Sequence, residues 1–312
     1  MRRTIRSATR VRCALLGLAL AAAGSPGAAG PASGVALEIV GDATPFAPGV
    51  ASTAHADIRL TLSPDGDTAL WFSRDRPGGA GGYDIWMSRR IAGRWSEASP
   101  VAFNSPSRDF DPAFSADGRF VYFCSDRPGG LGGDDLYRVA VTQTGFGAVE
   151  HLGPAVNSAA NEFAPMLASR GDRLLFSSDR AGGNGGHDLF AAARSGTGFA
   201  PAQRLPGPVN TTANEFDATF LHDGATIVFA RAQDFRRDRV DMFVSSPQAG
   251  RYPAGERLPS PANSSRYDSY GAMLDWSTPD ILTFSAERAD GQGMDLYRLR
   301  YRLRAVVNHT AD

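Results

Sequence analysis

The stretch Phe-Cys-Ser-Asp-Arg-Pro-Gly-Gly-Leu-Gly-Gly-Asp-Asp-Leu-Tyr, residues 123–137, decides the fold of this chain of 312 residues. An apolar, strand-like run ends at Ser125, a Gly-rich loop follows, and a second strand-like run begins after Asp135. The ending of this stretch, Asp followed by an apolar and an aromatic residue, occurs five times in the sequence. Its aspartates are Asp84, Asp135, Asp188, Asp241 and Asp295. Their spacings of 51, 53, 53 and 54 residues predict five copies of one structural unit.

Other residue types recur at the same period. An asparagine returns every 53 residues, at Asn104, Asn157, Asn210 and Asn263. An acidic residue also returns, at Asp57, Asp109, Glu162, Glu215 and Asp268. Several columns with a shared period indicate repeats that fill most of the chain.

Each unit is composed of strand-like runs separated by turns. In the second unit, residues 111–115, 120–125, 136–142 and 149–152 are the four expected strands. An Asp-Gly pair, Asp117-Gly118, joins the first two of them, and this pair is a strong signal for a hairpin because Gly adopts positive φ without steric cost. Four antiparallel strands in a repeat of this length are typical of a β-propeller blade.

A propeller must close into a ring, since an open edge invites aggregation. The last unit contains three strands and ends near Arg304, whereas Val35–Val40 is an unassigned strand-like run before the first unit. We therefore expect residues 35–40 to be the fourth strand of the last blade. The alternative, six blades, needs about 50 more residues. The predicted fold is an all-β, five-bladed propeller in a single domain, 31–312, with blades at about 53–104, 105–157, 158–210, 211–263 and 264–305.

The N-terminus is predicted to be a secretory signal peptide, residues 1–30. Five arginines and no acidic residue precede an apolar run at residues 13–23, and small residues follow it. We expect cleavage between residues 23 and 30 and a periplasmic or secreted location in a bacterium. The apolar run is too short to span a membrane, so no transmembrane segment is expected.

Composition excludes some functions. The formal net charge is −1, and all 32 basic residues are arginine, so a nucleic-acid binder driven by bulk charge is not expected. The 35 glycines and 20 prolines indicate a chain rich in turns. If Cys13 leaves with the signal peptide, Cys124 has no partner for an internal disulfide. Its apolar neighbours predict a buried, inert thiol.

The units at residues 72–86 and 123–137 resemble the WD-like propeller repeat of the TolB type, through the shared Asp-Arg-Pro-Gly-Gly-x-Gly-Gly loop. The resemblance covers nearly the whole mature chain. It implies an exported bacterial propeller that binds proteins or cell-envelope components. Relatives often carry an OmpA-like domain after the propeller; this sequence reaches Asp312 without such a domain, so we expect none.

The repeated charged residues have a structural and a functional interpretation. The aspartates of the five Asp-apolar-aromatic endings are expected to accept backbone N–H groups at the start of the third strand. The acid column, together with Arg76, Arg127, Arg180 and Arg288, predicts a charged ring on the channel face. Its guanidinium groups either bond to the carboxylates within the propeller, or the ring binds a ligand or a hard cation such as Ca²⁺. Because Gln233 replaces the arginine in blade four, Glu215 is expected to lack a partner.

Blade four departs most from the shared pattern. Its loop, residues 232–239, has no glycine and contains Phe235, Arg236, Arg237 and Arg239. Arginine and aromatic residues are favoured at the centres of protein interfaces. These four residues are therefore a candidate partner-binding patch, with divergence of a degenerate blade as the alternative.

Catalytic motifs are not evident. The five histidines have no zinc-binding spacing, and no Gly-x-Ser-x-Gly motif occurs, so no catalytic residue and no metal ligand is assigned. The predicted function is a non-enzymatic, monomeric binding or scaffolding propeller that recognises a protein or envelope component on one face. The alternative is a carbohydrate-active or other hydrolase that uses carboxylates on that face. A channel filled with paired side chains would favour binding.

Overall fold

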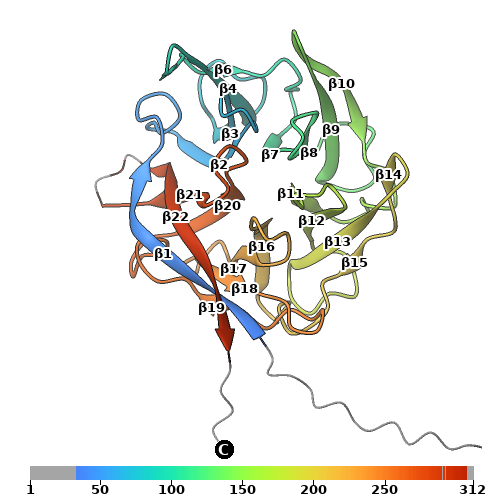
Figure 1. The fold of residues 1–312 in the computed structure, drawn as a ribbon. Helices are drawn as coiled ribbons and strands as arrows, with labels where there is room; N and C mark the ends of the chain where they lie inside the picture. The colour runs from blue at the N-terminus through green and yellow to red at the C-terminus, as the bar shows by residue number, and fades with distance from the viewer. Residues whose placement is uncertain (1–32, 290, 292, 308–312) are drawn as a thin grey trace, which may run out of the picture.

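The computed structural model describes residues 33–289, 291 and 293–307. The predicted signal peptide lies outside these residues. Five antiparallel sheets are arranged around a central axis, and the described part of the chain contains no helix (Figure 1). This arrangement confirms the five-bladed propeller that the repeat spacing predicted. No helix able to cross a membrane is found in the described residues.

The blades follow one another along the chain, and the first strand of each blade lies innermost (Figure 1). Blade one contains β2 (Ala56–Leu62), β3 (Thr68–Arg74), β4 (Tyr83–Ile91), β5 (Arg94–Trp95) and β6 (Ser99–Pro100). Blade two contains β7 (Asp109–Phe114), β8 (Phe120–Ser125), β9 (Asp135–Thr142) and β10 (Gly145–His151). Blade three contains β11 (Glu162–Leu167), β12 (Arg173–Ser178), β13 (Asp188–Ser195), β14 (Gly198–Phe199) and β15 (Gln203–Arg204).

Blades four and five complete the ring. Blade four contains β16 (Asn214–Phe220), β17 (Ile227–Ala232), β18 (Asp241–Ser245) and β19 (Glu256–Arg257). Blade five contains β20 (Ser269–Leu274), β21 (Ile281–Glu287), β22 (Met294–Val307) and β1 (Ser33–Pro45). The inner strands contact one another in the order β2, β7, β11, β16 and β20, and β20 contacts β2 again.

The ring is closed by the N-terminal strand, as predicted. β1 pairs antiparallel with β22, with Leu37 opposite Leu303 and Ile39 opposite Tyr301. The observed strand is longer than the predicted Val35–Val40. Because the two ends of the described chain pair in one sheet, β1 covers the edge of β22 and completes the four strands of blade five.

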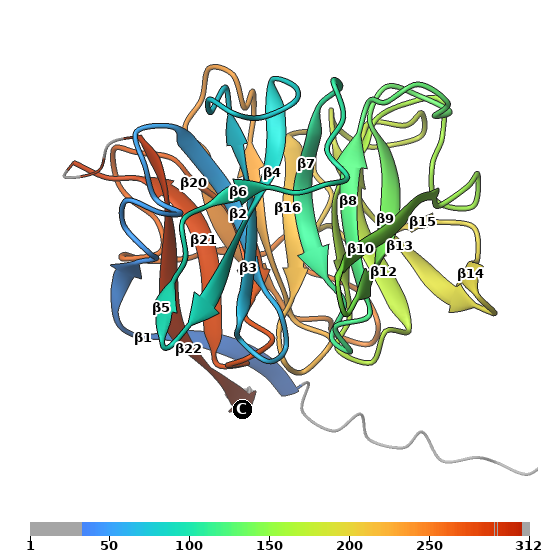
Figure 2. The same cartoon turned by 90° about the horizontal axis from the view of Figure 1, so that it is seen from above.

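The strand order gives the disc two different faces (Figure 2). The loops that join the second strand to the third, and one blade to the next, lie on one face, which we call the loop face. The turns that join the first strand to the second lie on the opposite face, which we call the turn face. Three of these turns contain the Asp-Gly pairs Asp65-Gly66, Asp117-Gly118 and Asp223-Gly224, and all three glycines have positive φ.

Candidate functional site

The predicted ring of acids does not line the channel. Asp57, Asp109, Glu162 and Glu215 are fully buried inside the blades. Each accepts hydrogen bonds from the backbone N–H and the hydroxyl of a Ser or Thr four residues earlier, as Glu162 does from Ser158 at 2.8 and 2.6 Å. These four carboxylates lie at the beginning of the inner strands and bond to groups of their own blade, which explains why they are not on the channel face. They hold the incoming loop against the sheet.

An arginine completes each of these buried sites. Arg76 lies 3.7 Å from Asp57, Arg180 lies 2.9 Å from Glu162, and Arg127 pairs with Asp109. Each guanidinium also covers two stacked or paired aromatic rings, for example Phe176 and Phe190 at 5.3 and 4.8 Å from Arg180. Because the carboxylate oxygens are bonded to hydroxyl, amide and guanidinium groups, these acids do not form a cation site.

Blade four corrects one prediction. Glu215 does not lack a partner, because Arg231 on β17 lies 2.6 Å from its carboxylate. The guanidinium of Arg231 covers Phe229 and Phe243 at 5.1 and 4.6 Å, as the arginines of the other blades cover their own ring pairs. An arginine two residues before Gln233 therefore does the work of the missing one.

Blade five corrects a second prediction, which placed Asp268 in the column of buried acids. The residue that corresponds to the buried acids is Ser269, which lies opposite Ala286 as Glu215 lies opposite Arg231. Asp268 precedes it on the loop face and accepts a hydrogen bond from the backbone N–H of Val240 at 2.9 Å. Arg288 lies 3.3 Å from the Ser269 hydroxyl and donates to the carbonyls of Pro261 and Ala262 at 2.9 and 3.1 Å.

The aspartates of the repeated endings organise the Gly-rich loops. Asp84 accepts backbone N–H bonds from Ala80 and Gly81, and Asp188 accepts one from Asn184 at 2.6 Å. Asp135 does the same with Leu131 and Gly132. A Cβ at Gly79, Gly130 or Gly183 would lie 2.0, 2.0 or 2.4 Å from the carboxylate, so the loop can wrap around it only where glycine occurs. Asp295, in blade five, is also buried and has partners.

In blade four, arginine side chains bond to the corresponding aspartate. Asp241 is bonded by Arg239 at 2.8 Å and by Arg257 at 2.7 and 2.9 Å, and these two side chains lower the pKa of Asp241 against the opposing effect of burial. Arg239 also donates to the carbonyl of Ser265 at 2.8 Å. Arg239 is therefore used inside the protein and is not free for a partner. Because this loop does not have to wrap around the aspartate, it can contain residues other than glycine.

Residues 235–238 of this loop are exposed to solvent. The side chain of Arg237 is 85% exposed and lies 3.6 Å from Asp234, and the guanidinium of Arg236 lies 5.7 Å from the Phe235 ring. Phe235 is 42% exposed, which is unusual for a large apolar side chain in this chain. Its ring contacts His187 and Phe216 at centroid distances of 5.7 and 5.8 Å.

These contacts join Phe235 to an aromatic cluster at the channel mouth. We call this set the mouth cluster: Phe163, His187, Phe216, Phe235 and Tyr270. Phe163, Phe216 and Tyr270 are equivalent residues of the inner strands of blades three, four and five. The cluster therefore extends from the channel mouth onto the loop of blade four.

Below the mouth, the channel is filled by Arg59. Each inner strand has a β-bulge whose first residue has positive φ: Arg59, Asp111, Ala164, Asp217 and Gly271. A bulge redirects the side chain of the inserted residue. Arg59, in blade one, is fully buried and crosses to the opposite blades, where it lies 3.4 Å from Asp217 and donates to the carbonyl of Pro165 at 3.1 Å. Residues from three blades thus meet at the centre.

The two central carboxyl groups differ. Asp217 has the ion pair with Arg59 and accepts from the backbone N–H of Gly271 at 3.1 Å. Burial, together with the charge of Asp217, raises the pKa of Asp111 to about 8. One guanidinium cannot balance two buried carboxylates, and of the two it is Asp217 that pairs with Arg59.

A second contact spans the channel toward the turn face. The indole N–H of Trp276, in blade five, donates to the carbonyl of Phe114, in blade two, at 2.8 Å. Sequence reasoning did not identify Arg59, Asp111, Asp217 or Trp276. The first three belong to one column with Ala164 and Gly271, at spacings of 52 to 54 residues, and this column is the signal that the sequence offers. Its meaning depends on the bulge, which the spacing does not reveal.

The described residues show few features of a catalytic centre. Within residues 33–289, 291 and 293–307, no group of three or more His, Cys, Asp or Glu is placed to hold a metal ion. Two surface cavities, of about 180 and 580 Å³, are each lined by one carboxylate, Asp117 and Glu97 respectively. Cys124 is a fully buried free thiol, and burial raises its pKa well above the usual value.

Fold and site together define a five-bladed β-propeller whose channel is filled by side chains and whose loop face carries an aromatic cluster. No protein-family profile and no curated protein sequence matches the chain. Solved structures are similar in fold. TolB from Acinetobacter baumannii aligns with a TM-score of 0.48 and 14% identity over 80% of this chain, which spans 56% of that protein.

Two other solved structures align with this chain over a larger share of their own length. A protein assigned as TolB from Agrobacterium tumefaciens aligns with a TM-score of 0.50 and 15% identity, over 81% of each chain. An α-L-arabinofuranosidase from Lactobacillus brevis aligns with a TM-score of 0.53 and 10% identity, over 82% of this chain and 93% of that one. The resemblance to TolB is thus supported by the fold. The fold itself is shared with a glycoside hydrolase.

Proposed function

We propose that this protein is a non-enzymatic binding propeller of the bacterial periplasm or cell envelope, and that it holds a protein partner at the mouth cluster. The observation that carries the proposal is the position of Phe235. This exposed ring extends the aromatic cluster of the channel mouth onto the one loop that lacks the shared Gly-rich design. Exposed aromatic rings beside arginine are typical anchors of protein interfaces.

The filled channel supports binding over hydrolysis. A glycosidase of the usual type needs two carboxyl groups about 5–10 Å apart that a substrate can reach. Asp111 and Asp217 are 3% and 5% exposed, and Arg59 occupies the space between their blades. A ligand on the loop face therefore meets the mouth cluster before it meets these carboxyl groups.

The periplasmic location is inferred from the signal-peptide pattern of residues 1–30 and from the resemblance to TolB-type repeats. The partner's chemistry is inferred from the surface. Phe235 would contact an apolar side chain, and Arg236 would pair with an acidic residue next to it. Arg237 lies 3.6 Å from Asp234, so it would contribute less to the binding of an acidic residue.

The test begins with cross-linking of the exported protein in cells and identification of the partner captured in the periplasmic fraction. The affinity of the purified partner is then measured for the wild type and for Phe235→Ala. We expect a loss of affinity of about tenfold or more, as for an aromatic anchor. Ile91→Ala is the matched control, because Ile91 is 65% exposed and lies at the end of β4 toward the turn face.

Equal affinities for the Phe235→Ala and Ile91→Ala variants would refute the assigned surface. Recovery of the protein in the cytoplasm with residues 1–30 intact would refute the location. Turnover of a chromogenic glycoside that is lost in Asp111→Asn would favour the hydrolase instead.

A further inference from the structure

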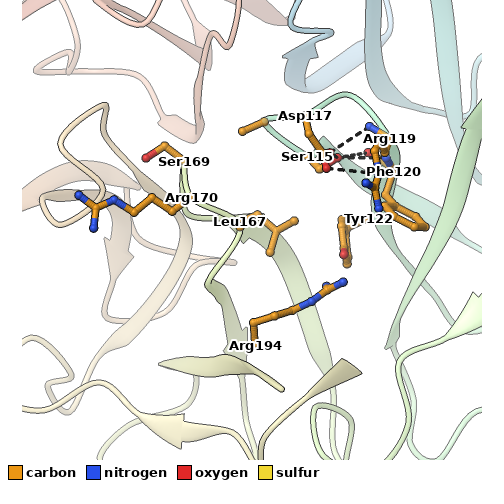
Figure 3. A pocket seen from close by; sticks show the side chains of 11 residues that line it. Ser115, Asp117, Arg119, Phe120, Tyr122, Leu167, Ser169, Arg170 and Arg194 are labelled. Atoms are coloured by element: carbon orange, nitrogen blue, oxygen red, sulfur yellow. Dashed lines mark hydrogen bonds and ion pairs between the residues drawn. The ribbon is translucent and has the colours of Figure 1, made fainter. Parts of the chain in front are cut away.

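A second surface feature lies on the turn face, between blades two and three. A cavity of about 180 Å³ separates the turn after β7 from the turn after β11. Arg119, Phe120 and Tyr122 line it from blade two, and Leu167, Arg170 and Arg194 line it from blade three (Figure 3). It is remote from the mouth cluster, which lies on the loop face.

The corresponding seam between blades three and four is filled. Between blades three and four, Arg173 donates to the carbonyl of Gly224 at 2.6 Å and covers the ring of Phe220 at 4.9 Å. In blade two the residue in the register position of Arg173 is Phe120, which lies opposite Ala140 as Arg173 lies opposite Ala193. Phenylalanine has no group that could bond to the neighbouring turn, so the seam stays open.

Positive charge surrounds this open seam. No ion pair to Arg170 or Arg194 is found among the residues that the structure describes. Arg119 lies 3.5 Å from Asp117, but their side chains are 72% and 54% exposed, so this pair is weak. The lining thus has three arginines and one carboxylate. Guanidinium groups without a carboxylate partner favour an anion.

The shape of the cavity restricts the ligand. Figure 3 shows the guanidinium of Arg194 directed into the gap beside Tyr122, with Arg119 on the blade-two side and Arg170 pointing away. Leu167 and Tyr122 are almost fully buried and form an apolar floor. A volume of 180 Å³ corresponds to about six water molecules at about 30 Å³ each, which is enough for one small organic molecule.

We propose that the cavity between blades two and three binds one small carboxylate-bearing molecule of the size of a sugar acid. Its carboxylate pairs with Arg194 and, from the other side, with Arg119. Its apolar face lies on Leu167. The site does not depend on the partner surface of the loop face, and the protein can carry both.

Calorimetric titration of the purified mature protein with glucuronate tests this site, with glucose as the neutral analogue of the same size. We expect glucuronate to bind and glucose not to bind. Arg194→Met keeps the length and the apolar part of the side chain but removes the charge, and it should weaken glucuronate binding by about tenfold or more. Arg90→Ala, another exposed arginine outside the cavity, should leave the affinity unchanged.

Circular dichroism and melting temperature show whether Arg194→Met is folded, and Arg119→Met is a second variant that should weaken binding by itself. The proposal is overturned if glucose and glucuronate bind equally, if neither binds, or if folded Arg194→Met and Arg119→Met retain the wild-type affinity. A loss of equal size in Arg90→Ala would show general charge attraction and would overturn it as well.

Discussion

Blades three and four do the same structural work with different residues. In blade three, glycines let the loop wrap Asp188, and Arg180 after the strand pairs with Glu162. In blade four, Arg239 and Arg257 bond to Asp241, and Arg231 within the strand pairs with Glu215. In both blades the two buried carboxylates accept hydrogen bonds or ion pairs from groups of the same blade. The difference is that blade four no longer needs glycines in its loop, so Phe235 and Arg236 can be exposed there.

If Arg231 truly replaces the arginine of the other blades, its loss should be costly. Arg231→Ala leaves Glu215 buried without its ion pair and should lower the free energy of unfolding by about 3–5 kcal/mol. Arg180→Ala in blade three should have an effect of similar size. Chemical denaturation monitored by fluorescence measures both. Gln233→Ala is the control and should change stability by less than about 0.5 kcal/mol; the reverse order of the two blade-four variants would contradict the replacement.

The glycine requirement should apply to the Gly-rich loop of blade three and not to every glycine of that blade. A Cβ at Gly183 would lie 2.4 Å from the Asp188 carboxylate, so Gly183→Ala should destabilise the fold by about 1–3 kcal/mol. A Cβ at Gly198, in the same blade, would have no atom within 4 Å. Gly198→Ala should therefore be neutral or slightly stabilising in thermal unfolding. Equal destabilisation by both variants would show that the Gly-rich loop is not packed as described.

Blades two and four differ in the equivalent aspartates of their inner strands. Asp217 forms an ion pair with Arg59, and Asp111 does not. The raised pKa of Asp111, about 8, means that the folded state holds a proton that the unfolded chain releases near pH 4. This contribution is complete below about pH 4 and is lost as pH rises to about 8, by at most about 1.4 kcal/mol per pH unit.

Asp111→Asn should remove this part of the pH dependence. Denaturation curves of the wild type and the variant between pH 4 and 9 give the difference directly, because the other buried carboxyl groups are common to both proteins. Identical slopes for the two proteins would mean that Asp111 is ionised in the folded state.

Much of the fold could be predicted from the sequence, because a propeller repeats one local pattern. Residue spacing indicated five blades, and the unassigned strand-like run at residues 35–40 indicated the closing strand. The same spacing failed by one residue at Asp268, because blade five is one residue longer before its inner strand and Ser269 takes the equivalent place. It also failed at Glu215, because Arg231 reaches the carboxylate from a different position in the strand.

What the sequence by itself determined is the strand and turn pattern of each blade, since this pattern depends on alternation, turn residues and short-range hydrogen bonds. What only the tertiary structure decided are the side-chain contacts between blades. Arg59 reaches Asp217 across 158 residues, Trp276 reaches Phe114 across 162, and Phe235 of blade four lies beside His187 of blade three. The physical reason is that closure of the ring and the bulges of the inner strands bring these side chains together, and neither the angle between blades nor the direction of a bulged residue is encoded in the spacing of one repeat.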